Sequence, residues 1–125
     1  MATAMQHTER ETHTLIAADK VEGTDVYNAD GDHLGHVHDV MLDKRSGRVA
    51  YAIMAFGGFL GIGEKYTPLP WSSLTYDTRM GGYLVPYPKE VLRSGPAFSE
   101  SELSDDDTDW REPVHTHYGA PPYWM

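Results

Sequence analysis

Two histidines that lie two positions apart, His36 and His38, are the side chains in this sequence best placed to do chemistry. If their segment is a strand, both imidazoles share one face and could bind the same metal ion. Four further side chains could complete its ligand shell: His33, Asp39, His115 and His117. A metal or small-ligand site on this face is therefore an alternative to a solvated face that binds nothing.

The other reactive side chains form no recognisable catalytic pattern. The sequence contains no cysteine, which excludes disulfides, thiolate metal sites and cysteine nucleophiles. Ser72, Ser73 and Ser94 have no base nearby in the sequence, and no G-x-S-x-G turn occurs. The acidic run 105–109 lacks the regular ligand spacing and the glycine of a calcium loop. We therefore predict that the protein is not an enzyme and uses no cofactor.

The element that would position His36 and His38 is a predicted strand, Leu34–Asp43. It follows a first strand at Thr24–Asn28 and an Asp-Gly turn, which is a strong hairpin signal. Strict alternation leaves neither face of the second strand uniformly apolar. We predict a β-bulge near Asp39 that turns both histidines to solvent. The bulge would gather three apolar side chains on the other face: Val37, Val40 and Leu42.

The central strand is predicted at Val49–Phe56, where eight consecutive residues are apolar. A small antiparallel sheet normally buries one face, so the second face needs a terminal segment, a partner chain or both. The segment 57–63 then spaces four glycines through three large apolar residues, which suits a loop packed on the chain's own tail or a second subunit. We predict that eight side chains form the binding interface: Phe59, Leu60, Ile62, Tyr66, Trp71, Tyr118, Tyr123 and Trp124.

Shorter elements complete the chain. A strand at Lys65–Leu69 should lie at a sheet edge, because its prolines cannot donate to a neighbour. A hairpin joins 74–77 to 82–86, and 88–93 forms one helical turn. Ser99–Glu102 has the form of a capping box and begins an acidic helix. Seven glycines are assigned structural roles because glycine accepts positive φ: Gly31, Gly35, Gly47, Gly57, Gly58, Gly61 and Gly63.

Length and charge limit the fold and the partners. A chain of 125 residues with 12 glycines and 8 prolines suits one turn-rich, mainly β domain. The net charge is −9, and no basic stripe is present, so nucleic acid and anionic membrane surfaces are poor partners, and we expect no nucleic-acid binding. The first twenty residues contain no apolar core of a signal peptide, and no run approaches a membrane span. We expect a cytoplasmic protein without membrane insertion.

The order of these segments resembles the PRC-barrel domains. The matching pieces are DVYNADGDHLGHVHDVMLDKRSGRVAYAIMAFGG, FLGIGEKYTPLPWSSLTYD and GGYLVPYPKEVLRSGPAF, and the ending YGAPPYW resembles that of bacterial stand-alone members. The resemblance implies a small, strongly bent antiparallel β-barrel of about six strands, with short helical turns and an aromatic C-terminal tail. Members commonly carry ordinary charged residues at the positions of His36 and His38, which favours the solvated face.

The resemblance also implies a domain organisation and a function. We predict a disordered polar leader at 1–14, the barrel at 15–98, and a short acidic helix with an aromatic tail at 99–125. The tail would pack on its own barrel or on a neighbouring subunit. The chain is similar to the cytoplasmic domain of the photosynthetic reaction centre H subunit and to the C-terminal domain of a ribosome maturation factor, which both bind other proteins. We therefore predict a non-catalytic protein-interaction or assembly module with an unidentified protein partner, without assigning it either of these two roles. The doubly apolar central strand and the glycine loop further predict a homo-oligomer, most simply a homodimer.

Overall fold

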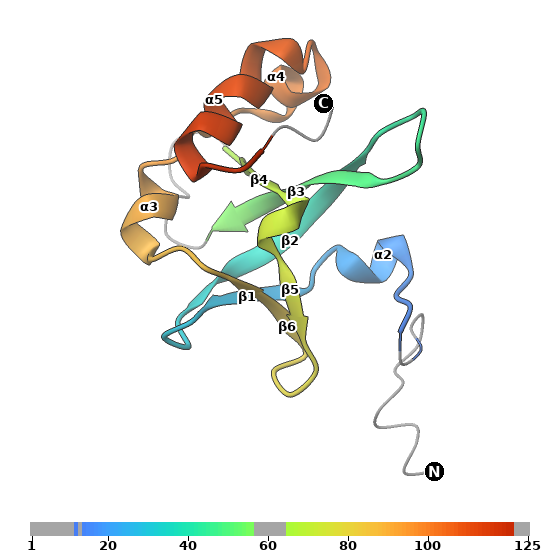
Figure 1. Ribbon diagram of the computed structural model, residues 1–125, viewed down its shortest axis with the longest axis vertical. Helices are drawn as coiled ribbons and strands as arrows, with labels where there is room; N and C mark the ends of the chain where they lie inside the picture. The colour runs from blue at the N-terminus through green and yellow to red at the C-terminus, as the bar shows by residue number, and fades with distance from the viewer. Residues whose placement is uncertain (1–11, 13, 57–64, 122–125) are drawn as a thin grey trace.

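The computed structural model consists of one twisted sheet of six strands, with the C-terminal helices packed on one side of it (Figure 1). It describes residues 12, 14–56 and 65–121. The strands are β1 Asp25–Asn28, β2 His33–Leu42, β3 Val49–Phe56, β4 Thr67–Pro70, β5 Thr75–Asp77 and β6 Gly82–Val85. The helices are α2 Ala18–Val21, the 3-10 helix η1 Trp71–Ser73, α3 Lys89–Arg93, α4 Glu100–Ser104 and α5 Thr108–Tyr118.

The sheet is mixed, whereas the sequence predicted an antiparallel barrel. Its strand order is β4-β3-β2-β1-β6-β5, and β1 pairs in parallel with β6, with Val26 opposite Tyr83. Among the described residues β4 and β5 are the two edges, so the sheet is not closed into a barrel. The local hairpins between neighbouring strands are antiparallel, as predicted. No turn joins β1 to β6, so no local signal in the sequence indicates their relative direction.

The predicted bulge in β2 is confirmed. The register of β2 against β3 shifts between Val37 and Asp39, and Val37 is completely buried. The prediction for the following residues was wrong, because a second shift lies between Met41 and Leu42. Val40 is half-buried, while 54% of the Leu42 side chain is exposed. The end of β2 therefore presents a large apolar side chain to solvent.

The central strand β3 is buried on both faces, from Ala50 to Met54 without interruption. Its neighbours in the sheet are β2 and β4. On one face, Tyr51 meets Trp110 of α5 edge to face, with their ring centroids 4.9 Å apart. Aromatic pairs at this separation are favourable beyond the area that they bury. The terminal segment thus covers the second apolar face of β3 within a single chain.

The smaller elements follow the predicted order. The edge strand β4 contains both prolines, and β5 and β6 form the predicted hairpin. Helix α3 begins after Pro88. At the start of α4 the capping box is confirmed, because Ser99 Oγ accepts from the Glu102 N–H at 3.3 Å and the Glu102 carboxylate accepts from the Ser99 N–H at 2.7 Å. None of the helices within the described ranges is long and apolar enough to span a membrane.

The sequence predicted an aromatic tail where the structure has α5, an eleven-residue helix. Trp110, Val114 and Tyr118 are spaced by four residues and are all buried, so they form the inner face of this helix. Pro113 lies inside the helix. Gly119 ends the helix in the left-handed conformation, with φ of 67°. The described part of the C-terminal segment is therefore mainly helical.

Gly35 allows β2 and β3 to approach each other closely. A Cβ atom at this position would overlap the backbone carbonyl oxygen of Ala55 on β3. A backbone carbonyl within a paired strand cannot move aside as a flexible side chain can. Four of the seven glycines assigned structural roles lie outside the described residues: Gly57, Gly58, Gly61 and Gly63.

Candidate functional site: a groove beside the β2–β3 hairpin

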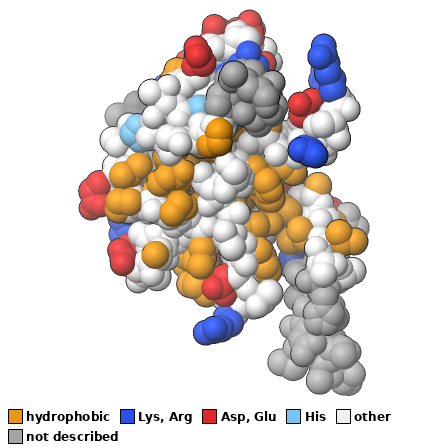
Figure 2. Space-filling view, viewed as in Figure 1, with side chains coloured by type: hydrophobic (Ala, Val, Ile, Leu, Met, Phe, Trp, Pro, Cys, Tyr) orange, Lys and Arg blue, Asp and Glu red, His pale blue; other side chains and the backbone are white. Residues whose placement is uncertain are grey.

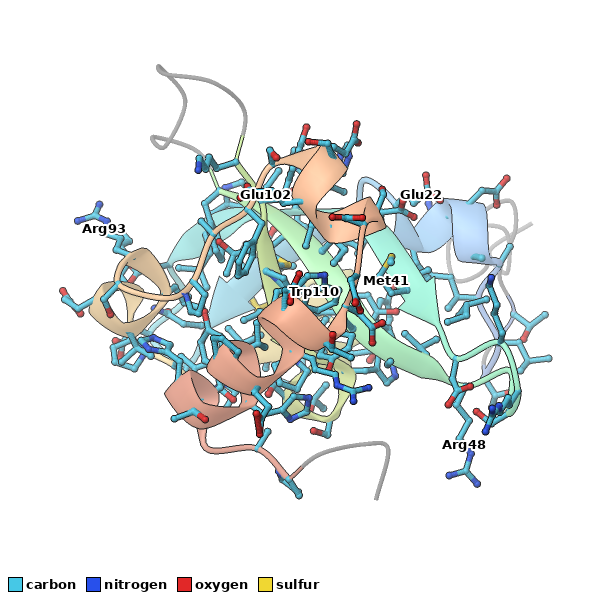
Figure 3. The ribbon with its side chains drawn as sticks, turned by 90° about the horizontal axis from the view of Figure 1, so that it is seen from above. Glu22, Met41, Arg48, Arg93, Glu102 and Trp110 are labelled. Atoms are coloured by element: carbon cyan, nitrogen blue, oxygen red, sulfur yellow. The ribbon has the colours of Figure 1, made fainter. Side chains whose placement is uncertain are left out.

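The hairpin formed by β2 and β3 projects beyond the body of the molecule (Figure 1). Its tip carries three exposed cations, Lys44, Arg45 and Arg48. Arg48 points away from the body in Figure 3. Asp43 stabilises the turn, because its Oδ1 accepts from the Arg45 N–H at 2.8 Å. The turn geometry therefore leaves the three cationic groups in solvent.

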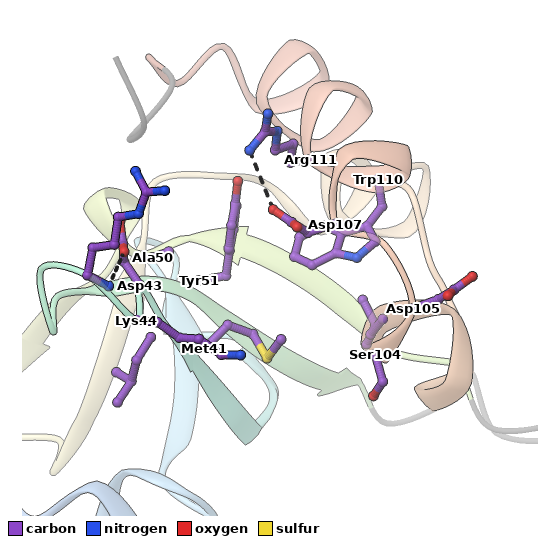
Figure 4. Close-up of a pocket in the computed structure, with 13 residues that line it drawn as sticks. Met41, Asp43, Lys44, Ala50, Tyr51, Ser104, Asp105, Asp107, Trp110 and Arg111 are labelled. Carbon is purple, nitrogen blue, oxygen red and sulfur yellow. Dashed lines mark hydrogen bonds and ion pairs between the residues drawn. The ribbon is translucent and has the colours of Figure 1, made fainter.

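Helices α4 and α5 lie across from this hairpin (Figures 3 and 4). Leu103 of α4 and Trp110 of α5 are buried, with 5% and 1% of their surface exposed. Asp105 and Asp107 lie between these two helices. The burial of the two apolar side chains turns the acidic connection outward, and in Figure 4 Asp107 lies toward the hairpin whereas the Asp105 carboxylate points away from it.

A groove of about 500 Å³ separates the hairpin from the helices (Figure 4). Its apolar lining comes from both sides: Met41, Leu42, Ala50, Tyr51, Leu103 and Trp110. Charged side chains complete the lining: Asp43, Lys44, Arg45, Asp105, Asp107 and Arg111. The groove is thus lined by apolar and charged side chains in similar number, a mixture that suits contact with a partner surface.

A buried hydrogen-bond chain holds the end of α5 against β3. The Nδ1–H of His115 donates to the carbonyl oxygen of Ala120 at 3.1 Å, because a carbonyl oxygen can only accept. Nε2 then accepts from the Tyr51 hydroxyl at 2.7 Å. Both side chains are buried. These groups fix the position of α5 beside the groove.

Two buried polar groups of α5 have no hydrogen-bond partner. They are Trp110 Nε1 and the Tyr118 hydroxyl. Burial, with a smaller contribution from neighbouring Tyr87, raises the pKa of Tyr118 far above its usual value, so this phenol stays protonated. An unpaired buried donor costs about 1–3 kcal/mol. The packing of α5 is thus stabilised by apolar contact, at the expense of two unpaired donors.

The two walls of the groove carry opposite charge. In Figure 2 the basic side chains of the projecting hairpin stand apart from the acidic side chains above the C-terminal helices. In the described part of the chain, Lys44 and Arg45 form no ion pair across the groove, whereas Arg111 pairs with Asp107 at 3.5 Å. Because the two walls carry opposite charge, a partner with complementary charges would be oriented in the groove.

Three of the eight predicted interface residues lie in the described structure, and each packs within the chain. Tyr66 is buried and forms an isolated bridge with Phe98. Trp71 is half-buried, edge to face with Tyr83. Tyr118 packs on the ring of Tyr87. The other five lie outside the described residues, and the interface role of the set stays a prediction: Phe59, Leu60, Ile62, Tyr123 and Trp124.

His36 precedes the bulge, His38 is the extra residue within it, and the two have different surroundings. His36 is exposed, as predicted. His38 is instead half-buried, because its ring stacks on Tyr66 with centroids 4.1 Å apart and its Nε2 lies 2.8 Å from Glu100 Oε1. Over residues 12, 14–56 and 65–121, no group of three or more His, Cys, Asp or Glu side chains is arranged to hold a metal ion. No observation therefore favours the alternative metal site.

The sequence analysis did not assign Met41, Leu42 or Trp110 to a site. A signal for Trp110 was present, because its spacing to Val114 and Tyr118 is that of one helix face. No pattern brings Met41 and Trp110 together, since β2 and α5 are far apart in the chain. Their proximity depends on how α5 packs against the sheet.

The PRC-barrel domain family matches residues 13–92 of the chain. The match includes all six strands and most of α3, but neither α4 nor α5. A search of curated proteins found no match. The groove therefore lies between the part of the chain that matches the family and the helices that follow it.

Proposed function

This chain belongs to the PRC-barrel family, and on that premise we propose that it is a protein-interaction module that binds its partner in the groove beside the β2–β3 hairpin. PRC-barrel domains are generally non-catalytic. A cytoplasmic location is part of the proposal.

The exposure of Leu42 at the mouth of an apolar groove carries this proposal. More than half of this side chain is in solvent, and it adjoins the half-buried Met41. Burying apolar surface is worth about 25 cal/mol per Å², so a partner that covered both side chains would gain affinity. Apolar surface bordered by charged residues is characteristic of protein interfaces.

The polar groups nearest the groove support binding rather than catalysis. Tyr51 and His115 are buried and form a hydrogen bond with each other, which holds α5 in place. Asp107 is paired with Arg111 within α5 and its cap. The groups that do reach solvent are the charged side chains on the walls, which suit recognition of a polar partner surface.

The experiment compares tagged wild-type protein with Leu42→Asp and with the control Leu15→Asp. Leu15 is also exposed, at 72%, and does not line the groove. Each variant is expressed in the cells from which the gene comes, and co-purifying proteins, including untagged copies of this chain, are quantified by mass spectrometry. Wild type and Leu15→Asp should retain a partner that Leu42→Asp loses, with unchanged thermal melts. The same proteins at the same levels with all three forms would refute the proposal.

A further inference from the structure

We propose that the partner is a second copy of this chain, and that two copies associate through the groove about a two-fold axis. The inference rests on the proposed function and specifies its partner. Its basis is the distribution of charge: the hairpin wall is basic and the helical wall is acidic, with an apolar floor between them.

The basic wall is formed by Lys44 and Arg45, with Arg48 next to them at the tip. All three side chains are exposed. Among the described residues none of them has an acidic side chain within ion-pair distance. The hairpin therefore carries three exposed cations against one carboxylate at its turn, Asp43, and has a net positive charge.

The acidic wall follows α4 and the start of α5. Asp105 is exposed and lines the groove, and Asp107 is about half exposed. Asp106 and Asp109 add negative charge beside them. Within the described residues, Arg111 pairs with one of these carboxylates, Asp107. The helices therefore present an excess of negative charge opposite the basic hairpin.

A two-fold rotation matches these walls to each other. When the axis runs along the groove, between its two walls, the hairpin of one copy lies against the helices of the other, and the reverse contact forms at the same time. Cations then meet carboxylates twice, and the exposed Leu42 of each copy is brought to the shared apolar floor. One surface thereby supplies both halves of a complementary interface.

The overall charge of −9 opposes association of two identical chains. A partner with an acidic surface and no basic wall would match only the hairpin. A second copy matches both walls, which is why we favour it. Because the charged walls are exposed to solvent, self-association should weaken as ionic strength rises.

The test uses charge reversal of each wall in the full chain. The hairpin variant is Lys44→Glu with Arg45→Glu, and the helix variant is Asp105→Lys with Asp107→Lys. A matched control, Lys89→Glu with Arg93→Glu, makes the same change of net charge as the hairpin variant with two exposed cations of α3. If the helix variant melts at a lower temperature than wild type, Asp105→Lys alone replaces it. Masses and dissociation constants are measured by light scattering and sedimentation equilibrium.

Wild type and the α3 control should form dimers of twice the 14.0 kDa chain mass. Each wall variant alone should have a dissociation constant at least tenfold higher. An equimolar mixture of the two wall variants should recover dimers with one copy of each, because every basic wall then meets an acidic one. A monomeric wild type, equal dimerisation by the control and both wall variants, or a mixture that stays monomeric would each overturn the inference. If the wild type is a monomer but co-purifies with another protein that Leu42→Asp does not retain, this inference is overturned and the proposed function stands.

Discussion

Replacing Trp110 by alanine should loosen the C-terminal helices from the sheet and lower the stability of the whole domain. The indole is 1% exposed and contacts the rings of Tyr51 and Phe98, with centroid separations of 4.9 and 6.3 Å. Truncation of a buried tryptophan to alanine costs about 3–5 kcal/mol. The substitution also removes the unpaired indole N–H, whose burial costs about 1–3 kcal/mol, so part of that cost is regained. The net loss should therefore be about 2–4 kcal/mol.

Urea unfolding followed by far-ultraviolet circular dichroism measures this loss without relying on the fluorescence of the residue removed. Hydrogen exchange should show the largest loss of protection in α5. Trp110→Phe is the matched control: it keeps an aromatic ring and removes the unpaired donor, so it should cost less than about 1.5 kcal/mol. A loss below about 1 kcal/mol for Trp110→Ala, or unchanged protection of α5, would contradict the core role of this side chain.

Three further predictions concern single contacts. Gly35→Ala should destabilise the fold by about 1–3 kcal/mol, because the new methyl group meets the backbone of β3; a chemical-denaturation midpoint equal to wild type would contradict this. Tyr51→Phe should cost about 1–2 kcal/mol, since it removes the buried hydrogen bond between the Tyr51 hydroxyl and His115 Nε2, and unchanged exchange protection at the end of α5 would count against it. Hydrogen bonds from Ser99 lower the pKa of Glu102, so the capping box stabilises α4 above the ordinary carboxylate pKa and is lost as pH falls through the lowered value. In an acid titration by circular dichroism, Glu102→Gln should remove that part of the pH dependence, and an unchanged profile would refute the link.

Much of the fold was predictable from local patterns. The Asp-Gly turn, the bulge in β2, the proline-containing edge strand and the capping box each depend on residues close together in the sequence, and the structure has each of them. The PRC-barrel assignment rests on the order of these same segments. Local steric and hydrogen-bonding preferences act within a few residues, so the elements that depend on them can be predicted from the sequence without knowledge of the fold.

For helix α5 the prediction from local patterns was wrong. Trp110, Val114 and Tyr118 have helical spacing, yet the abundance of Pro, Gly, His and aromatic residues from Glu112 onward favoured an aromatic tail. A mid-helix proline normally disfavours a helix. Here the burial of the inner face against β3 and β4 outweighs that local cost, and such burial depends on residues distant in sequence.

By itself, the sequence determined the family, the order of strands along the chain, the apolar central strand and the uneven distribution of charge. Only the tertiary structure decided that β1 and β6 run in parallel and that α5 covers β3. It also decided that a basic hairpin lies across an apolar groove from acidic helices. The physical reason is that pairing and burial join segments far apart in the chain, and their free energy depends on surfaces that exist only once the chain has folded.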